Sequence, residues 1–131
     1  MRCCPSSVLG IVIRAISAHL IGKAGFTRVQ AQTGAATLIQ RFGGALNLNI
    51  HYHMLMLDGV YITQVNDRLR FVPVAAPTFA ELTRLIEQIS QRVGRHLERL
   101  GLLVRDTENA YLQWNGEPAS LLDDLAGHSI T

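Results

Sequence analysis

Residues 45–59 read ALNLNIHYHMLMLDG, and this stretch decides the expected fold. The run is long and mostly apolar, and it ends in Asp58-Gly59, so it predicts a β-strand followed by a tight turn. Side chains alternate between the two faces of a strand, which places His51 and His53 on the same face. The opposite face is apolar enough to pack on helices, and it carries Ile50, Tyr52, Met54 and Met56.

The two histidines are a candidate metal site. They stand roughly 7 Å apart along the strand because each residue rises about 3.3 Å, and their rings can lean onto one cation. Two imidazoles in an otherwise apolar strand cost desolvation free energy unless something binds them. The alternative is that His51 and His53 are ordinary polar residues on a half-exposed strand face. As the third ligand we expect Gln40 or another polar group nearby.

The composition indicates one small domain spanning residues 1–131. A hydrophobic content of 48% is typical of a globular protein, and a net charge of +2 permits a polyanionic partner without requiring one. No apolar run reaches the roughly 18 residues of a membrane span, so we expect no membrane partner. Cys3 and Cys4 cannot supply a disulfide framework or a zinc site, so we expect two reduced thiols in a cytoplasmic protein.

Strands and a helix are expected around the histidine strand. Ser6 or Ser7 can cap a helix that ends at Ile21, before Gly22. Residues 35–42 are apolar and fit either a strand or a helix. We expect residues 60–65 to form an antiparallel hairpin with the histidine strand, and residues 68–74 to follow after a turn at Asn66-Asp67. The histidine strand would then be the central strand of the sheet.

A second long helix is the clearest element of the sequence. Thr78-x-x-Glu81 is a capping box, and Gly101 is a natural C-terminal cap. One face of the helix is an apolar stripe of Phe79, Leu82, Leu85, Ile86, Ile89, Val93, Leu97 and Leu100. Away from this stripe lie four arginines, Arg84, Arg92, Arg95 and Arg99. They form either a solvated face or a ridge that contacts phosphates. Beyond this helix we expect a short strand at 111–114 and a short helix at 119–126.

The central run resembles a known family. Residues 34–61 read GAATLIQRFGGALNLNIHYHMLMLDGVY. In the order of its residue types this run resembles the core of the two-tyrosine rolling-circle transposases of bacterial insertion sequences, which carry the His-hydrophobic-His (HUH) signature. Tyr52 fills the hydrophobic position, and the similarity extends over residues 8–102. The resemblance implies an α/β (α+β) fold with a central antiparallel sheet that carries the histidine strand and is flanked by helices.

The resemblance also implies a chemistry. In the family, the two histidines and a third polar ligand hold Mg²⁺ or Mn²⁺, which polarises a phosphate of single-stranded DNA at the transposon end. A tyrosine hydroxyl attacks that phosphate, a 5′-phosphotyrosine link forms, and a 3′-hydroxyl is released. For this chain the resemblance therefore implies metal binding at His51 and His53. If the arginines of the second long helix contact phosphates, the DNA would bind through Arg84, Arg92, Arg95 and Arg99.

The chain departs from the family pattern in two places. The downstream helix with the catalytic tyrosines and the upstream cysteine-rich zinc module are both missing, so we expect a truncated transposase fragment. Tyr52 faces away from the histidines, the face of Tyr61 depends on the hairpin register, and Tyr111 is the one remaining candidate nucleophile. We therefore do not assume that this chain is an active enzyme.

Two other classes of function are compatible with parts of the pattern. The first is a non-catalytic relic that binds single-stranded DNA without turnover. The second is a cupin or a barrel amidohydrolase, which also use His-x-His pairs. A cupin would need a Glu shortly after the pair, where residues 54–57 are Met-Leu-Met-Leu, and the barrel needs far more chain.

Overall fold

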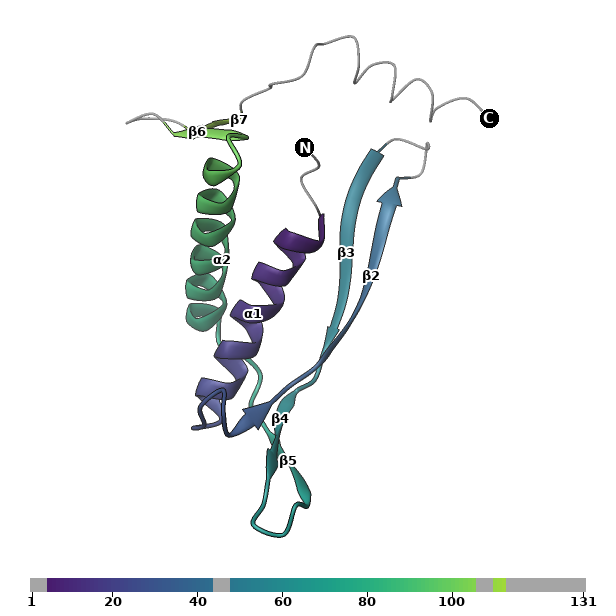
Figure 1. The fold of residues 1–131 in the computed structure, drawn as a ribbon, viewed down its shortest axis with the longest axis vertical. Coiled ribbons are helices and arrows are strands. Elements are labelled where there is room, and N and C mark those ends of the chain that lie inside the picture. The colour runs from purple at the N-terminus through teal and green to yellow at the C-terminus, as the bar shows by residue number, and fades with distance from the viewer. Residues whose placement is uncertain (1–4, 44–47, 106–109, 113–131) are drawn as a thin grey trace. The chain divides into compact units, whose positions relative to one another are not determined.

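The computed structural model describes residues 5–43, 48–105 and 110–112 (Figure 1). The chain divides into two compact parts, one made of residues 1–36 and 54–95, the other of residues 37–53 and 96–131. The organisation as a single domain stays a prediction. Within the described ranges, no helix is both long and apolar enough to cross a membrane.

Helix α1 (Pro5–Lys23) opens the first part. It begins before the predicted caps at Ser6 or Ser7, because the fixed φ of Pro5 suits the first helical position. It also ends later than the predicted Ile21. Gly25 takes a positive φ of 83°, and the amide of Phe26 donates to the carbonyl of Ile21 at 3.1 Å. This is a Schellman motif, so Gly25 rather than Gly22 terminates the helix.

A three-stranded antiparallel sheet follows, with the order β1-β4-β5. Its strands are β1 (Ala31–Gln32), β4 (Gly59–Thr63) and β5 (Leu69–Pro73). The hairpin between β4 and β5 and its turn at Asn66-Asp67 confirm the prediction. Asp67 has a φ of 56°, a conformation that Asp tolerates, and its amide donates to the Gln64 carbonyl.

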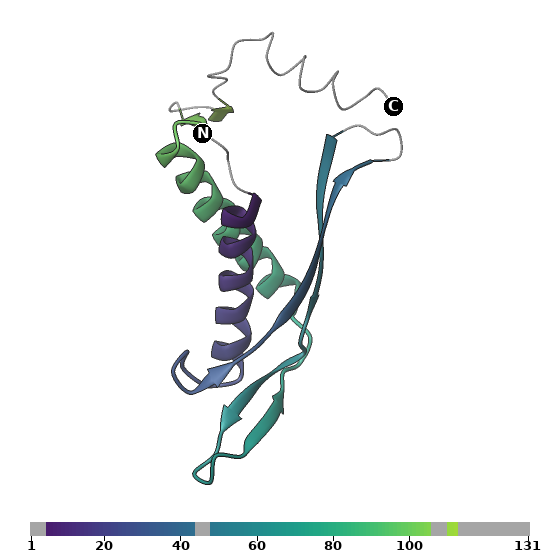
Figure 2. The ribbon, with the colours of Figure 1, turned by 45° about the vertical axis from the view of Figure 1, so that its right-hand side comes forward.

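The small core of this part lies between α1 and the sheet. Val60 is fully buried and packs with Ile21 of α1 and Ala31 of β1. The C-terminal end of α1 therefore lies against β1 and β4 (Figure 2). Half-buried apolar side chains surround this cluster, namely Leu20, Ala24, Phe26, Ile62 and Val72.

Helix α2 (Phe79–Arg99) confirms the second predicted helix. The amide of Thr78 donates to Oε2 of Glu81 at 2.7 Å, and the amide of Glu81 donates to Oγ1 of Thr78 at 3.2 Å, as a capping box requires. The start of the apolar stripe is uncovered among the described residues, since Phe79 is 86% exposed and Ile86 62%. Hydrophobic periodicity therefore identified the helix correctly, although these side chains are not part of the core described above.

The second part contains a ladder of two long strands. These are β2 (Ala35–Phe42) and β3 (Leu48–Met56), and both extend by a few residues into the first part. The ambiguous residues 35–42 are thus a strand, and β3 confirms the described portion of the histidine strand. The residues predicted at 45–47 lie outside the described ranges.

The predicted partner of the histidine strand is wrong. Within the described residues β3 pairs with β2, whereas β4 pairs with β1 and β5. The chain passes through Asp58-Gly59 without reversing, because the Leu57 amide bonds to the Gly34 carbonyl at 3.1 Å and the Val74 amide to the Asp58 carbonyl at 2.8 Å. Backbone groups on both sides of the break are therefore already paired, and β4 follows β3 along the chain instead of lying beside it.

The end of α2 and two short strands complete the described chain. Gly101 has a φ of 70°, and the Leu102 amide donates to the Leu97 carbonyl at 2.9 Å, which confirms Gly101 as the cap. Strands β6 (Leu103–Arg105) and β7 (Ala110–Leu112) pair antiparallel. Strand β7 confirms the start of the strand predicted at 111–114, and the helix predicted at 119–126 lies outside the described residues. The fold is thus α+β, with two helices and antiparallel sheets.

Candidate metal and nucleic-acid site

Strand β3 presents its two histidines on one face. His51 and His53 are exposed, whereas Tyr52 between them is half-buried, as the alternation of an extended strand requires. The alternation continues with half-buried Met54 and exposed Leu55. The predicted placement of both histidines on one face is therefore confirmed, and both side chains are exposed.

Gln40 lies next to His53 across the β2–β3 ladder. Its Oε1 is 3.0 Å from Nε2 of His53, and both side chains are exposed. In the tautomer that carries its proton on Nε2, the imidazole donates a hydrogen bond to the amide oxygen. Gln40 is the side chain that the sequence suggested as a third ligand, and strand pairing brings it beside His53 over 13 residues of chain.

The side chains of His51, His53 and Gln40 can be compared with the ligands that a divalent cation requires. Among the described residues, no three His, Cys, Asp or Glu side chains form a metal-binding group. A site on His51 and His53 therefore needs another kind of donor, which the amide oxygen of Gln40 provides. Octahedral ligands about 2.1 Å from Mg²⁺ lie about 3 Å from their neighbours. The 3.0 Å between Nε2 and Oε1 suits two adjacent ligands in the state in which Nε2 carries no proton, so these two donor atoms fit one divalent cation.

The four arginines of α2 are all exposed. At about 3.6 residues per turn, Arg84, Arg92, Arg95 and Arg99 fall within roughly 80° of one another around the helix. Throughout the part of the chain that the structure describes, none of their guanidinium groups has a hydrogen bond or an ion pair. Within the described residues their charges are therefore not neutralised by an acidic group, and DNA binding through them stays a prediction.

Comparison with known proteins identifies the family. Residues 34–119, more than half of the chain, match the family described as "Putative transposase" (Y2_Tnp). The chain belongs to this transposase family. No curated protein and no solved structure shows a significant match. The matched segment includes the histidine strand, Gln40 and the arginine face of α2.

The three tyrosines of this transposase chain have different surroundings. Tyr52 is half-buried and projects from the face of β3 opposite to its neighbours His51 and His53. Tyr61 stacks against Phe71 within the β4–β5 hairpin, with ring centroids 5.1 Å apart. Tyr111 lies on β7 opposite Val104, and its side chain is outside the described residues. Strand parity thus confirms the expected face of Tyr52, and the role of Tyr111 stays a prediction.

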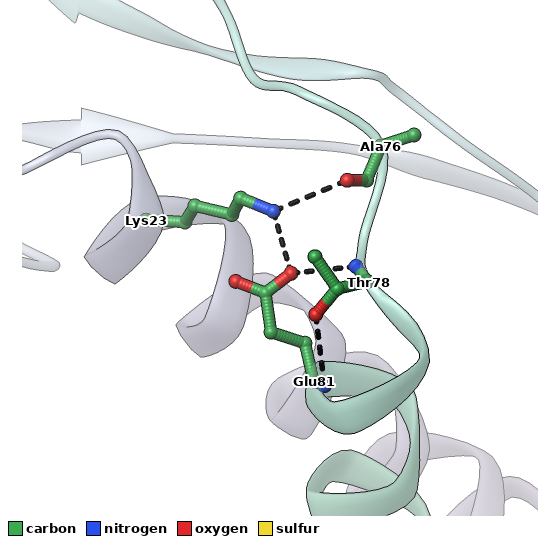
Figure 3. Close-up of polar contacts among 4 residues, drawn as sticks. All are labelled: Lys23, Ala76, Thr78 and Glu81. Atoms are coloured by element: carbon green, nitrogen blue, oxygen red, sulfur yellow. Dashed lines mark hydrogen bonds and ion pairs between the residues drawn. The ribbon is translucent and has the colours of Figure 1, made fainter.

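Lys23 and Glu81 connect the two helices of the transposase chain (Figure 3). Nζ of Lys23 is 2.7 Å from Oε2 of Glu81 and donates to the Ala76 carbonyl at 3.2 Å. The hydrogen bonds from Lys23 and from the Thr78 amide lower the pKa of Glu81 to about 2. Local sequence patterns could not have indicated this contact, because Lys23 and Glu81 are 58 residues apart in the chain.

Arg84 differs from the other three arginines in its surroundings, because it lines a cavity of about 350 Å³ between α1 and α2. The cavity is lined by Ala18, His19, Gly22, Lys23, Glu81, Arg84, Leu85 and Gln88. Nε2 of His19 is shielded from solvent and has no hydrogen-bond partner within the described ranges. Arg84 therefore shares its surroundings with Lys23 and His19, whereas Arg92, Arg95 and Arg99 do not line this cavity.

Proposed function

We propose that this chain is the metal-binding part of a transposase of the two-tyrosine HUH class, which cleaves and rejoins single-stranded DNA. The observation that carries this proposal is the pairing of Gln40 with His53 at 3.0 Å, beside His51 on the same strand face. Membership of a transposase family supplies the class of reaction. The arrangement of donors supports a divalent cation as its cofactor.

In this proposal His51, His53 and Gln40 hold Mg²⁺ or Mn²⁺, with each neutral imidazole offering a ring nitrogen lone pair. Imidazole would bind Zn²⁺ or Ni²⁺ more tightly, so the preference for Mg²⁺ or Mn²⁺ in function reflects their availability and the oxygen-rich substrate. The bound cation supplies Lewis-acid polarisation of the scissile phosphate. Before the cation binds, the amide oxygen of Gln40 can hold the His53 ring in place, because it lies within hydrogen-bonding distance of Nε2.

The second component is a path for the DNA backbone along α2. Arg92, Arg95 and Arg99 recur at helical spacing and have no acidic partner among the described residues, so they can contact successive phosphates. Arg84 extends the same face toward the α1–α2 cavity. We propose single-stranded DNA at transposon ends as the partner, since unpaired strands expose both phosphates and bases to a protein surface.

Cleavage of DNA needs a tyrosine nucleophile near the metal, whereas binding of DNA does not. Tyr52 projects away from the histidine face, and Tyr61 is held against Phe71. We therefore propose that this chain binds the metal and the strand and does not itself form the phosphotyrosine link. A non-catalytic DNA-binding relic is the second candidate, and it differs in having no need of a cation at His51 and His53.

Metal-dependent DNA affinity tests the proposal. Fluorescence anisotropy would measure binding of a labelled single strand to the wild-type chain and to the His51→Ala/His53→Ala variant, each with and without Mn²⁺. We expect Mn²⁺ to strengthen binding by the wild type and to have no effect on the variant. His19→Gln removes an imidazole elsewhere and should respond as the wild type does. If Mn²⁺ strengthened DNA binding equally in the wild type and the double variant, the metal site would be refuted and only the non-catalytic DNA-binding relic would remain as a candidate.

A further inference from the structure

The outer face of the β1-β4-β5 sheet carries two aromatic side chains that the proposed metal chemistry does not use. The strand register pairs Tyr61 directly with Phe71. Their ring centroids are 5.1 Å apart and the ring planes are inclined by 57°. The adjacent positions Val60 and Val72 point to the opposite face, where they pack toward α1. Alternation along the strands therefore directs both rings away from the core.

Both rings are open to solvent. Tyr61 is 41% exposed and Phe71 is 37% exposed, although each makes a contact with the other. More than half of each of these two residues is buried, and the remaining surface is open to solvent. An exposed cross-strand pair can also serve only to hold its hairpin together. The exposed part of such a pair, however, is also a surface on which an unpaired nucleobase can stack.

Gly59 keeps the Phe71 ring in place. A Cβ atom at position 59 would lie 2.5 Å from Cζ of Phe71 and would also collide with the Val72 carbonyl oxygen. The ring therefore packs directly over the backbone of Gly59, and this close approach depends on the missing side chain. The ring is thus held by the backbone of Gly59 on the neighbouring strand and by Tyr61, so little conformational entropy is lost when a ligand stacks on it.

Two cationic side chains lie on the same hairpin. Arg68 and Arg70 are exposed, and their guanidinium groups have no ion pair in the described part of the chain. Arg70 pairs with Ile62 and therefore lies on the face opposite to Tyr61 and Phe71, whereas Arg68 lies at the turn that contains Asp67, where its carbonyl accepts the Gln64 amide. A single strand that crosses this hairpin could place its phosphates near Arg68 at the turn and its bases on the aromatic rings.

We infer that Tyr61 and Phe71 form a stacking platform for the bases of single-stranded DNA. This inference rests on the proposed function, since its ligand is the strand that the transposase would hold. It adds a base-contacting surface to the phosphate-contacting arginines of α2. Stacking accepts any base, so the platform would hold the strand without reading its sequence.

A comparison of normal and abasic DNA tests the platform. Anisotropy would measure the affinity of the full chain, without metal, for a labelled strand of about ten nucleotides and for the same strand lacking its bases. We expect the wild type to prefer the normal strand by about 5- to 150-fold, the range for one stacked base. The Tyr61→Leu/Phe71→Leu variant keeps apolar side chains without π-faces, so it should lose this preference while its affinity for abasic DNA stays unchanged.

Control variants separate the platform from other effects. Tyr61→Phe keeps the aromatic ring and Leu69→Ala removes an exposed side chain of the same hairpin, so both should keep the preference. Equal affinity of the wild type for the two strands would overturn the platform and leave DNA binding through phosphates intact. A preference retained by the double leucine variant would overturn it as well. Binding of neither strand would refute the platform together with the proposed DNA partner, whereas the metal site is tested separately with Mn²⁺ alone.

Discussion

The ammonium group of Lys23 lies 2.7 Å from the carboxylate of Glu81, which joins the end of α1 to the first turn of α2. The same carboxylate oxygen accepts the amide of Thr78. One acidic side chain therefore both caps α2 and fixes its start against α1. Each of these hydrogen bonds favours the ionised carboxylate, so the contact depends on pH.

Stability should fall in acid because of Glu81. Its pKa is about 2 in the folded chain and 4.5 without these contacts, so the ionised form stabilises the fold at every pH above about 4.5. This contribution decreases as the pH falls from 4.5 toward 2. Urea unfolding between pH 2.5 and 7 should show a smaller decrease for Glu81→Gln than for the wild type. Glu87→Gln changes an exposed glutamate of the same helix that has no partner in the described ranges, and should follow the wild type.

Two glycine substitutions should change stability in opposite directions. Gly59→Ala places a methyl group against the Phe71 ring and the Val72 carbonyl, and should destabilise the chain by about 1–3 kcal/mol. Gly22→Ala meets no atom within 4 Å and lies in helix α1, where alanine is favoured by up to about 1 kcal/mol. Thermal unfolding of both variants measures the difference. A Gly59→Ala variant as stable as the wild type would mean that the Phe71 ring does not pack on the backbone there.

Local sequence patterns predicted the ends of α2 and missed the partner of the histidine strand. The capping box at Thr78 and the glycine cap at Gly101 each involve atoms within a few residues, so their patterns carry the whole interaction. Asp58-Gly59 has the composition of a hairpin turn, yet the backbone on either side is paired elsewhere, so the chain bends there without forming a hairpin. Which strands pair is decided by packing over the whole chain, and a two-residue pattern does not contain that information.

The candidate site likewise combines features that the sequence predicts with features that depend on strand pairing. Strand alternation was sufficient to place His51 and His53 together and Tyr52 opposite. Gln40 was suggested by its residue type alone, and its distance from His53 follows from the register of β2 against β3. The stacking of Tyr61 on Phe71 required the register of the β4–β5 hairpin, which the sequence left open.

The arginine face of α2 should determine how DNA affinity depends on salt. Each phosphate contact to a single strand contributes about 0.7 to the slope of log affinity against log salt concentration. Replacing Arg92, Arg95 and Arg99 with Ala should therefore reduce the slope by about 2 and weaken binding to all sequences alike. Arg14→Ala, a control on α1, should leave the slope unchanged. A triple variant with the affinity and slope of the wild type would show that these arginines only face solvent.

This chain should not form a covalent link to DNA. A tyrosine hydroxyl must come within about 3.5 Å of the phosphorus, and Tyr52 points to the wrong face of β3. Incubation with labelled single-stranded DNA and Mn²⁺, followed by a denaturing gel, should show no shifted protein band. A shifted band that Tyr111→Phe abolishes would contradict this expectation and would identify Tyr111 as a nucleophile.

The central claim is that His51, His53 and Gln40 hold one divalent cation. Calorimetric titration of the wild-type chain with Mn²⁺ measures this directly, in parallel with His51→Ala, His53→Ala and Gln40→Leu. We expect one Mn²⁺ per wild-type chain, no binding by either alanine variant, and weaker binding by Gln40→Leu, with His19→Gln unchanged. Equal Mn²⁺ binding by the wild type and a chain lacking both His51 and His53 would contradict the account.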